Sequence, residues 1–328
     1  MKAADDVVPK PEQEAVDSWV KALSESRFDD SLTLLESQLN GAEPQSRVLL
    51  ESIIGHVKME KDPAIGVPYF ENLVRQHPTK PEPYTWWALS YSLRELPDKT
   101  LAVLDRGLSQ VDAKAKLFEA KAGHLQTFGR LDEALEVARQ GVDADPSFVD
   151  NYLVAADLLA AKGDNDGARS WYLKALDVSL GEPNVADKYA LFLLNTDKYH
   201  EAILRYQDLV NRNPKDPKYY ALLGNAYLAA EFPGRALRAY RKANELAEGK
   251  VAWILANIGN LMNNRGFYSE AVEYLQKALE LDPTLKYAHE RLASAQQAEA
   301  DEAKRVGTVL AEVRSTLNKS EQPPAPAP

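Results

Sequence analysis

The sequence predicts an all-α fold, an α-solenoid of about eight helix-turn-helix repeats with a C-terminal capping helix. Alanines recur 34 or 35 residues apart, at Ala134, Ala168, Ala202, Ala236 and Ala271. A small residue lies twelve positions before each of them, and in four of five cases another lies seven positions after. Because antiparallel helices approach closely only where side chains are small, this shared register indicates stacked helical hairpins.

Each repeat is expected to hold a first helix, a short polar turn and a second helix. Two copies lie end to end in residues 213–283, where Gly224 and Gly259 sit within first helices and prolines separate the units. We expect the units near residues 12–45, 46–80, 81–114, 115–148, 149–182, 183–216, 217–251 and 252–285.

The two ends of the chain leave this register. Residues 1–11 are polar and Pro-broken, and residues 319–328 are Pro-rich, so both are expected to be flexible or disordered. Between them, residues 286–318 show helical spacing without a clear turn, which predicts a capping helix, continuous or bent near Asp301. The apolar residues that carry this spacing are Val306, Val309, Leu310, Val313 and Leu317.

The register resembles that of the tetratricopeptide-repeat (TPR) family over nearly the whole chain. Its clearest copy consists of Tyr220, Leu223, Gly224, Tyr227, Ala236, Tyr240 and Ala243. The resemblance implies a right-handed solenoid whose first helices line a concave, protein-binding groove. It is specific for the fold and says little about the particular function.

Composition narrows the classes of partner. The net charge of -10 disfavours a nucleic-acid backbone, and no apolar run is long enough for a membrane span. The chain has no cysteine, which excludes disulfides and thiolate chemistry. As written, it is expected in the cytoplasm. If a signal sequence was removed, the alternative is the periplasm or an association with the outer membrane.

The sequence shows no catalytic or metal-binding constellation, so we expect neither an enzyme nor a cofactor. The five histidines fall in five different units, and phosphate-binding and nucleophile-elbow motifs are absent. The acidic run 162–167 has calcium-loop character, but it stands where every repeat has a turn and lacks the distal Glu. We therefore interpret it as a turn.

The resemblance also maps residues onto the groove. The expected partner-binding residues are Trp86, Lys218, Asn225, Trp253, Asn257, Asn260 and Arg291. For Asn257 and Asn260, binding and simple solvent exposure stay open as alternatives, and the pair Asn263 and Asn264 is expected at an exposed turn. Asn225, Asn257 and Arg291 match three of the five positions of the clamp with which some TPR domains hold a peptide carboxylate. Ala221 and Tyr287 replace its two lysines, which favours an extended or helical segment that binds without its C-terminus.

The preferred function is a non-catalytic scaffold or adaptor that binds a protein or peptide in the concave groove. One alternative is a bacterial assembly, immunity or secretion-accessory factor with a single dedicated partner, perhaps in the cell envelope. Another is the regulatory subunit of an enzyme. The sequence leaves the partner and the oligomeric state open.

Overall fold

A computed structural model describes residues 18–320, which form helices joined by short turns without any strand. The expected N-terminal arm, the start of the first repeat and residues 321–328 lie outside the described residues. The chain divides into two compact units, residues 1–185 and 186–328. The prediction of an all-α fold built from helical hairpins is confirmed.

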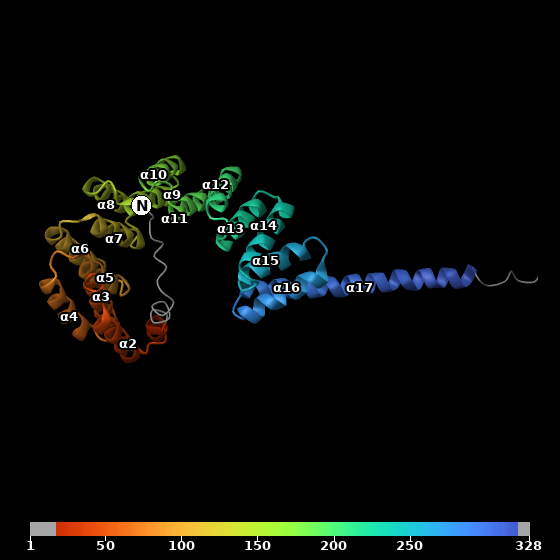
Figure 1. Cartoon of the computed structure of the whole chain (residues 1–328), viewed down its shortest axis with the longest axis horizontal. Coiled ribbons are helices and arrows are strands. Elements are labelled where there is room, and N and C mark those ends of the chain that lie inside the picture. Colours follow the sequence, from red (N-terminus) through yellow and green to blue (C-terminus); the bar gives the residue numbers. More distant parts are fainter. Residues whose placement is uncertain (1–17, 321–328) are drawn as a thin grey trace, which may run out of the picture. The chain divides into compact units, whose positions relative to one another are not determined.

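Unit 1 holds the hairpins of the first half of the chain (Figure 1). Residues 18–24 are helical and precede the first labelled helix. The helices that follow are α2 (Phe28–Gly41), α3 (Pro44–Lys61), α4 (Pro63–Gln76), α5 (Pro81–Ser92), α6 (Pro97–Gln110), α7 (Ala115–Thr127), α8 (Leu131–Ala144), α9 (Val149–Ala161) and α10 (Asn165–Val178).

Unit 2 holds the remaining hairpins and one long final helix. Helix α11 (Pro183–Asn195) spans the division between the units and lies mostly in unit 2. The others are α12 (Tyr199–Arg212), α13 (Pro217–Ala229), α14 (Pro233–Leu246), α15 (Ala252–Asn263), α16 (Tyr268–Leu281) and α17 (Lys286–Ser320).

The periodic alanines pack inside the hairpins. Ala134, Ala168, Ala202, Ala236 and Ala271 are all 0% exposed. The glycines on the facing helices allow this close approach: a Cβ on Gly224 would lie 2.9 Å from the Tyr240 ring, and one on Gly259 would lie 2.7 Å from Leu275 Cγ. Small residues therefore set the spacing between the two helices of a repeat, as the sequence register indicates.

A left-handed backbone residue closes seven of the described hairpins, the first of them at Ser26 before α2. Positive φ recurs 34 or 35 residues apart at Glu95, Gly129, Gly163, Asp197, Glu231 and Gly266. The acidic run 162–167 is such a turn, and the Asp164 carboxylate caps the next helix by accepting from the Gly167 N–H at 2.9 Å. The next position in register is Ala300, which stays helical, so α17 continues where a hairpin would otherwise turn.

Several neighbouring first helices contact one another. Helix α5 contacts α3 and α7, α7 contacts α9, and α15 contacts α17, whereas second helices of the described chain make no comparable contacts with each other. At these places the first helices form the more closely packed side. Residues on that side are positioned by two neighbouring helices at once, which suits them to present a binding surface.

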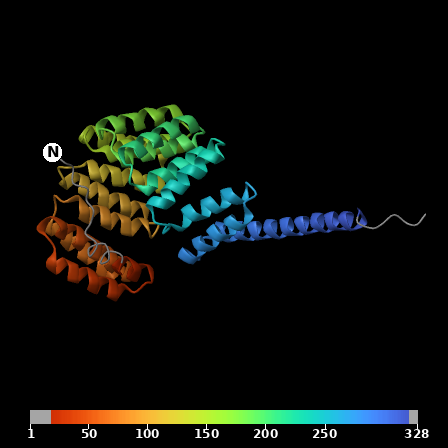
Figure 2. The same ribbon diagram turned by 45° about the vertical axis from the view of Figure 1, so that its right-hand side comes forward.

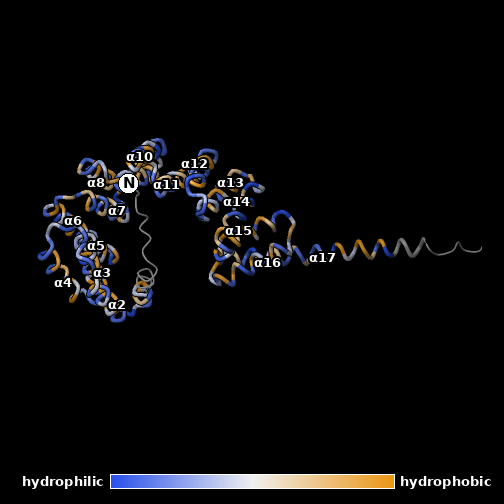
Figure 3. Tube along the Cα trace, viewed as in Figure 1, coloured by the Kyte–Doolittle hydropathy of each residue, from blue (hydrophilic) through white to orange (hydrophobic). Residues whose placement is uncertain are grey.

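Helix α17 differs in part from the expected cap. Its first half packs on α15 and α16 and buries Ala288 and Ala295 completely. Its second half runs on past the last hairpin, where orange, hydrophobic positions recur along the tube (Figures 2 and 3). The side chains of residues 303–314 are exposed. Only the first half acts as a cap, because the last hairpin is too short to cover a 35-residue helix.

Candidate functional site

The candidate site is the first-helix face of unit 2, which we define by the first helices α13, α15 and the start of α17, on which six of the seven predicted residues lie. On α15, Trp253, Asn257 and Asn260 follow one another at intervals of four and three residues, so they lie along one side of the helix. All three are half-buried. This side of α15 is therefore a shallow surface whose residues are neither core nor freely solvated.

Two contacts join this side of α15 to α17. The Tyr287 hydroxyl donates to the Trp253 carbonyl at 3.1 Å, and the Asn263 amide donates to Ser294 Oγ at 3.4 Å. Helices α15 and α17 therefore run side by side, with residues about 34 apart at the same level. That offset places Arg291 of α17 at the level of Asn257.

Two asparagines of α15 carry acceptors that the protein does not satisfy. The Oδ1 atoms of Asn260 and Asn263 are buried, and neither has a hydrogen-bond partner in the described chain. A buried acceptor without a partner costs free energy, so such atoms call for a donor from a ligand or from water. Asn264 is exposed as expected, but the expectation that Asn263 is also exposed is wrong, because it lies against α17.

Arg291 supplies positive charge beside these amides. It is exposed and forms no ion pair with the side chains of residues 18–314. A guanidinium carries five N–H donors in a planar fork, so it can hold a carboxylate or several backbone carbonyls. Donors from Arg291 and acceptors from the asparagines together match the alternating polar groups of a polypeptide backbone.

Lys218 and Asn225 lie in unit 2 as well, but internal partners occupy them. The Lys218 ammonium is 2.7 Å from Asp187 Oδ2, and this hydrogen-bonded pairing raises the pKa of the lysine. Asn225 Oδ1 accepts a hydrogen bond from the buried Tyr240 hydroxyl at 2.5 Å. Both residues are therefore engaged in holding neighbouring helices together.

Trp86 belongs to unit 1 and is separate from the other predicted residues. It is half-buried on α5, and its ring lies 5.5 Å from the His56 ring, centroid to centroid. It also lines a shallow hollow of about 190 Å³ that includes Lys116 and His124 of α7. One side of the Trp86 ring thus packs against His56, and the other side faces the shallow hollow.

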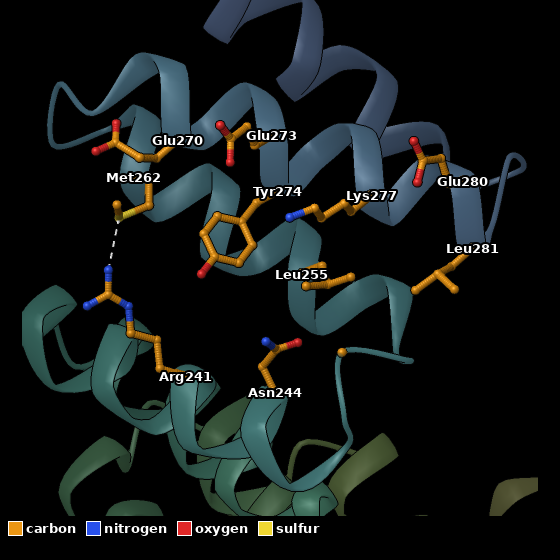
Figure 4. Close-up of a pocket in the computed structure, with 11 residues that line it drawn as sticks. Arg241, Asn244, Leu255, Met262, Glu270, Glu273, Tyr274, Lys277, Glu280 and Leu281 are labelled. Carbon is orange, nitrogen blue, oxygen red and sulfur yellow. Dashed lines mark hydrogen bonds between the residues drawn. The ribbon is translucent and has the colours of Figure 1, made fainter.

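Sequence reasoning missed a hollow of about 590 Å³ between α14, α15 and α16. In Figure 4, Arg241 and Asn244 point into it from α14, and Tyr274 and Lys277 point into it from α16. The floor includes Leu255 and Met262, whose sulfur lies 3.8 Å from an Arg241 nitrogen. The splaying of second helices creates this space, and no residue type in the sequence signals it.

The arrangement suits binding better than bond-breaking chemistry. One Ser–His pair is present, with His56 Nδ1 2.9 Å from Ser90 Oγ, but the Ser90 hydroxyl donates to the Trp86 carbonyl at 2.9 Å. That hydroxyl proton is directed away from the imidazole, which is the reverse of an activated nucleophile. Within residues 18–314, whose side chains the structure describes, no three potential ligands gather around a common metal position.

Comparisons with known proteins show which repeat family this chain resembles. One family model described as a tetratricopeptide repeat matches residues 120–182, and a second such model matches residues 254–285. The C-terminal part of a TPR repeat-containing protein from Cytophaga hutchinsonii has the same fold. Its TM-score is 0.53 at 20% identity, and the match covers 74% of this chain and 99% of that one.

Two curated relatives match this chain over only part of their own length. The TPR repeat-containing protein YpiA of Bacillus subtilis is 23% identical, over 75% of this chain and 57% of its own. The human protein O-mannosyl-transferase TMTC1 is 27% identical, over 56% of this chain and 21% of its own. The chain thus spans about a fifth of the transferase, and the repeat fold is generally that of non-catalytic protein-interaction scaffolds.

No helix within residues 18–320 combines the length and the apolar character that a membrane crossing requires.

Proposed function

Since this chain belongs to the tetratricopeptide-repeat family, we propose that it binds a partner polypeptide along the first-helix face of unit 2 and has no catalytic activity of its own. The observation that carries this proposal is the pair of buried, unpartnered Oδ1 atoms of Asn260 and Asn263. When these side chains turn outward, a bound segment can donate its backbone N–H groups to them and so remove an unfavourable feature of the free protein.

The chemistry of the face indicates an extended segment. Trp253 offers an aromatic surface, and the α15 amides offer acceptors over roughly 10 Å of helix at 1.5 Å per residue. Arg291 offers donors at the level of Asn257. Such a pattern recognises main-chain groups together with one anchoring apolar side chain, and a terminal carboxylate is not needed.

An affinity-capture experiment with two matched variants tests the proposal. The protein is used to capture partners, which are identified by mass spectrometry and then bound again as purified segments. We expect Arg291→Glu to weaken binding of the captured segment at least tenfold, because it reverses the charge on the binding face.

The control is Lys277→Glu, the same change of charge on an exposed residue of α16. It should leave that affinity within about twofold, since Lys277 lies on the second-helix side. Equal loss in both variants would assign binding to net charge, and unchanged binding in Arg291→Glu would remove this face from the site.

The identity of the captured partner decides between the finer versions of the proposal. A single dedicated envelope or secretion component would support an accessory factor, and an enzyme would support a regulatory subunit. Several unrelated partners that share a short segment would support a general adaptor.

A further inference from the structure

The second half of α17 carries an apolar stripe that no other part of the described chain covers. We define the α17 stripe as Val306, Val309, Leu310 and Val313, which are 48%, 52%, 54% and 49% exposed. The helix runs past the α15–α16 hairpin at this point (Figure 2). Four aliphatic side chains in one row are more than the scattered apolar residues of an ordinary surface.

The stripe continues a face that already packs against helices. Ala288 and Ala295 are buried under α15 and α16, and Leu292 packs against the same core. Val306, Leu310 and Val313 stand 18 residues after Ala288, Leu292 and Ala295, respectively. Because 18 residues are five turns of an α-helix, each exposed residue lies on the same side of α17 as its buried counterpart. This side of α17 is therefore a packing face that continues beyond the last hairpin.

The spacing of the stripe favours another helix as its cover. Exposed Ala303, Val306, Leu310 and Val313 are separated by three, four and three residues, and the sequence continues the pattern with Leu317. An alternation of three and four is the register in which two helices interlock their side chains. Trp and Phe, which helices on lipid surfaces use, are absent from residues 303–317.

The charges of this segment also permit a like helix to approach. At about 100° per residue, Lys304 and Glu312 lie more than a quarter-turn from the centre of the stripe. Arg305 and Arg314 each lie about a quarter-turn from it, at opposite edges of the apolar row. Gly307 lies on the same edge as Arg314, and Val309 lies on the opposite edge, so in a parallel pair Arg314 of one helix faces Val309 of the other across the seam.

We propose that two copies of the chain associate through their α17 stripes, each helix packing along the other. A second copy presents the same register, so the interface is self-complementary, as two-fold pairing requires. The repeats of both copies stay free in this arrangement, because the stripe begins beyond the last hairpin. The pairing would couple two partner-binding faces in one assembly.

Light scattering on the full-length protein tests this directly. At high concentration the mass should be near twice 36.5 kDa and should fall towards 36.5 kDa on dilution. In the double variant Leu310→Asp and Val313→Asp, the dissociation constant should rise by about 100-fold or more, because the seam would bury charge. Thr308→Asp, on the opposite side of the same helix, should keep the dimer.

A second measurement guards against loss of helix in the double variant. The chain has no cysteine, so Leu310→Cys and Thr308→Cys each introduce a single thiol. A short bis-maleimide should join two chains through position 310 and leave position 308 unjoined. A monomer at every concentration, or equal joining at both positions, would overturn the proposal. So would binding of the monomer to anionic phospholipid vesicles that the double variant abolishes.

Discussion

The Tyr240 hydroxyl of α14 donates a hydrogen bond to Asn225 Oδ1 of α13 at 2.5 Å. Tyr240 is buried, and burial raises the pKa of its hydroxyl, so the bond is a neutral one between the two helices of one repeat. The same link recurs two repeats earlier, where Tyr172 donates to Asp157, also 15 residues before it. Asn225 is therefore part of the internal architecture of the repeat.

Removing either side of this link should weaken the repeat. Tyr240→Phe is expected to lower the free energy of unfolding by about 1 kcal/mol, and Asn225→Ala by about 1–3 kcal/mol because it leaves a buried hydroxyl unpaired. The double variant should lose no more than the larger single loss, since both substitutions remove one interaction. Urea unfolding followed by circular dichroism measures all three.

Tyr274→Phe is the control for this cycle. Its hydroxyl makes no hydrogen bond within the described chain and faces the hollow between α14 and α16, so the substitution should be nearly neutral. Fully additive losses in the Tyr240–Asn225 cycle would show that the two residues do not act as a pair.

Replacing each of two helical glycines of unit 1 by alanine should change the free energy of unfolding in opposite directions. A Cβ on Gly66 would lie 2.6 Å from the Met59 Cα and backbone nitrogen, so Gly66→Ala must push two helices apart. We expect a loss of about 1–3 kcal/mol in stability. A Cβ on Gly123 would meet nothing within 4 Å, and Gly123→Ala should add about 0.5–1 kcal/mol.

Thermal unfolding of the two variants beside the parent checks this pair. A stabilised Gly66→Ala protein would mean that α3 and α4 are less closely packed than described.

Acid should destabilise the protein through His56. Burial lowers the pKa of this imidazole, an effect opposed by Glu60 and reinforced by Arg94. The unfolded chain then binds a proton near pH 6.5 that the folded chain does not bind, so the free energy of unfolding falls as pH falls below about 6.5. Burial lowers the pKa of His124 as well, which adds to the same slope.

His56→Asn should flatten this pH dependence between about pH 7 and pH 5, and a further His124→Asn should flatten it more. Asn places an amide where His56 Nδ1 meets Ser90 Oγ, so the hydrogen bond can persist. Denaturant unfolding at several pH values supplies the measurement. A slope unchanged in the double variant would remove these two histidines as its source.

The hairpins could be predicted from the sequence because the small residues at helix contacts recur at a regular spacing. Ala236 and Ala271 reveal where helices touch, and Gly224 and Gly259 reveal which helix faces them. The end of the array was harder to predict. That α17 continues through Ala300 rests on the absence of a left-handed residue there, and the exposure of the stripe depends on where the last hairpin stops.

Parts of the candidate site could not be predicted from the sequence. The type of a polar residue does not show whether its hydrogen-bond partner belongs to the protein itself or to a ligand. Lys218 and Asn225 have the residue types of a binding face, yet Asp187 and Tyr240 engage them. The pair Asp157 and Tyr172, at the same 15-residue spacing, was the one available signal for Asn225. The hollow beside Tyr274 arises from helix splay, which residue types do not encode.

Site-specific photo-crosslinking tests the central claim most directly. A benzophenone side chain replaces Asn260 on the first-helix face, and the matched control replaces Glu273, an exposed residue on the second-helix side of the same repeat. Irradiation in cells of the source organism should join a discrete polypeptide to position 260 and not to position 273. Adducts of equal yield at both positions, or at position 273 alone, would contradict a partner-binding surface on α15.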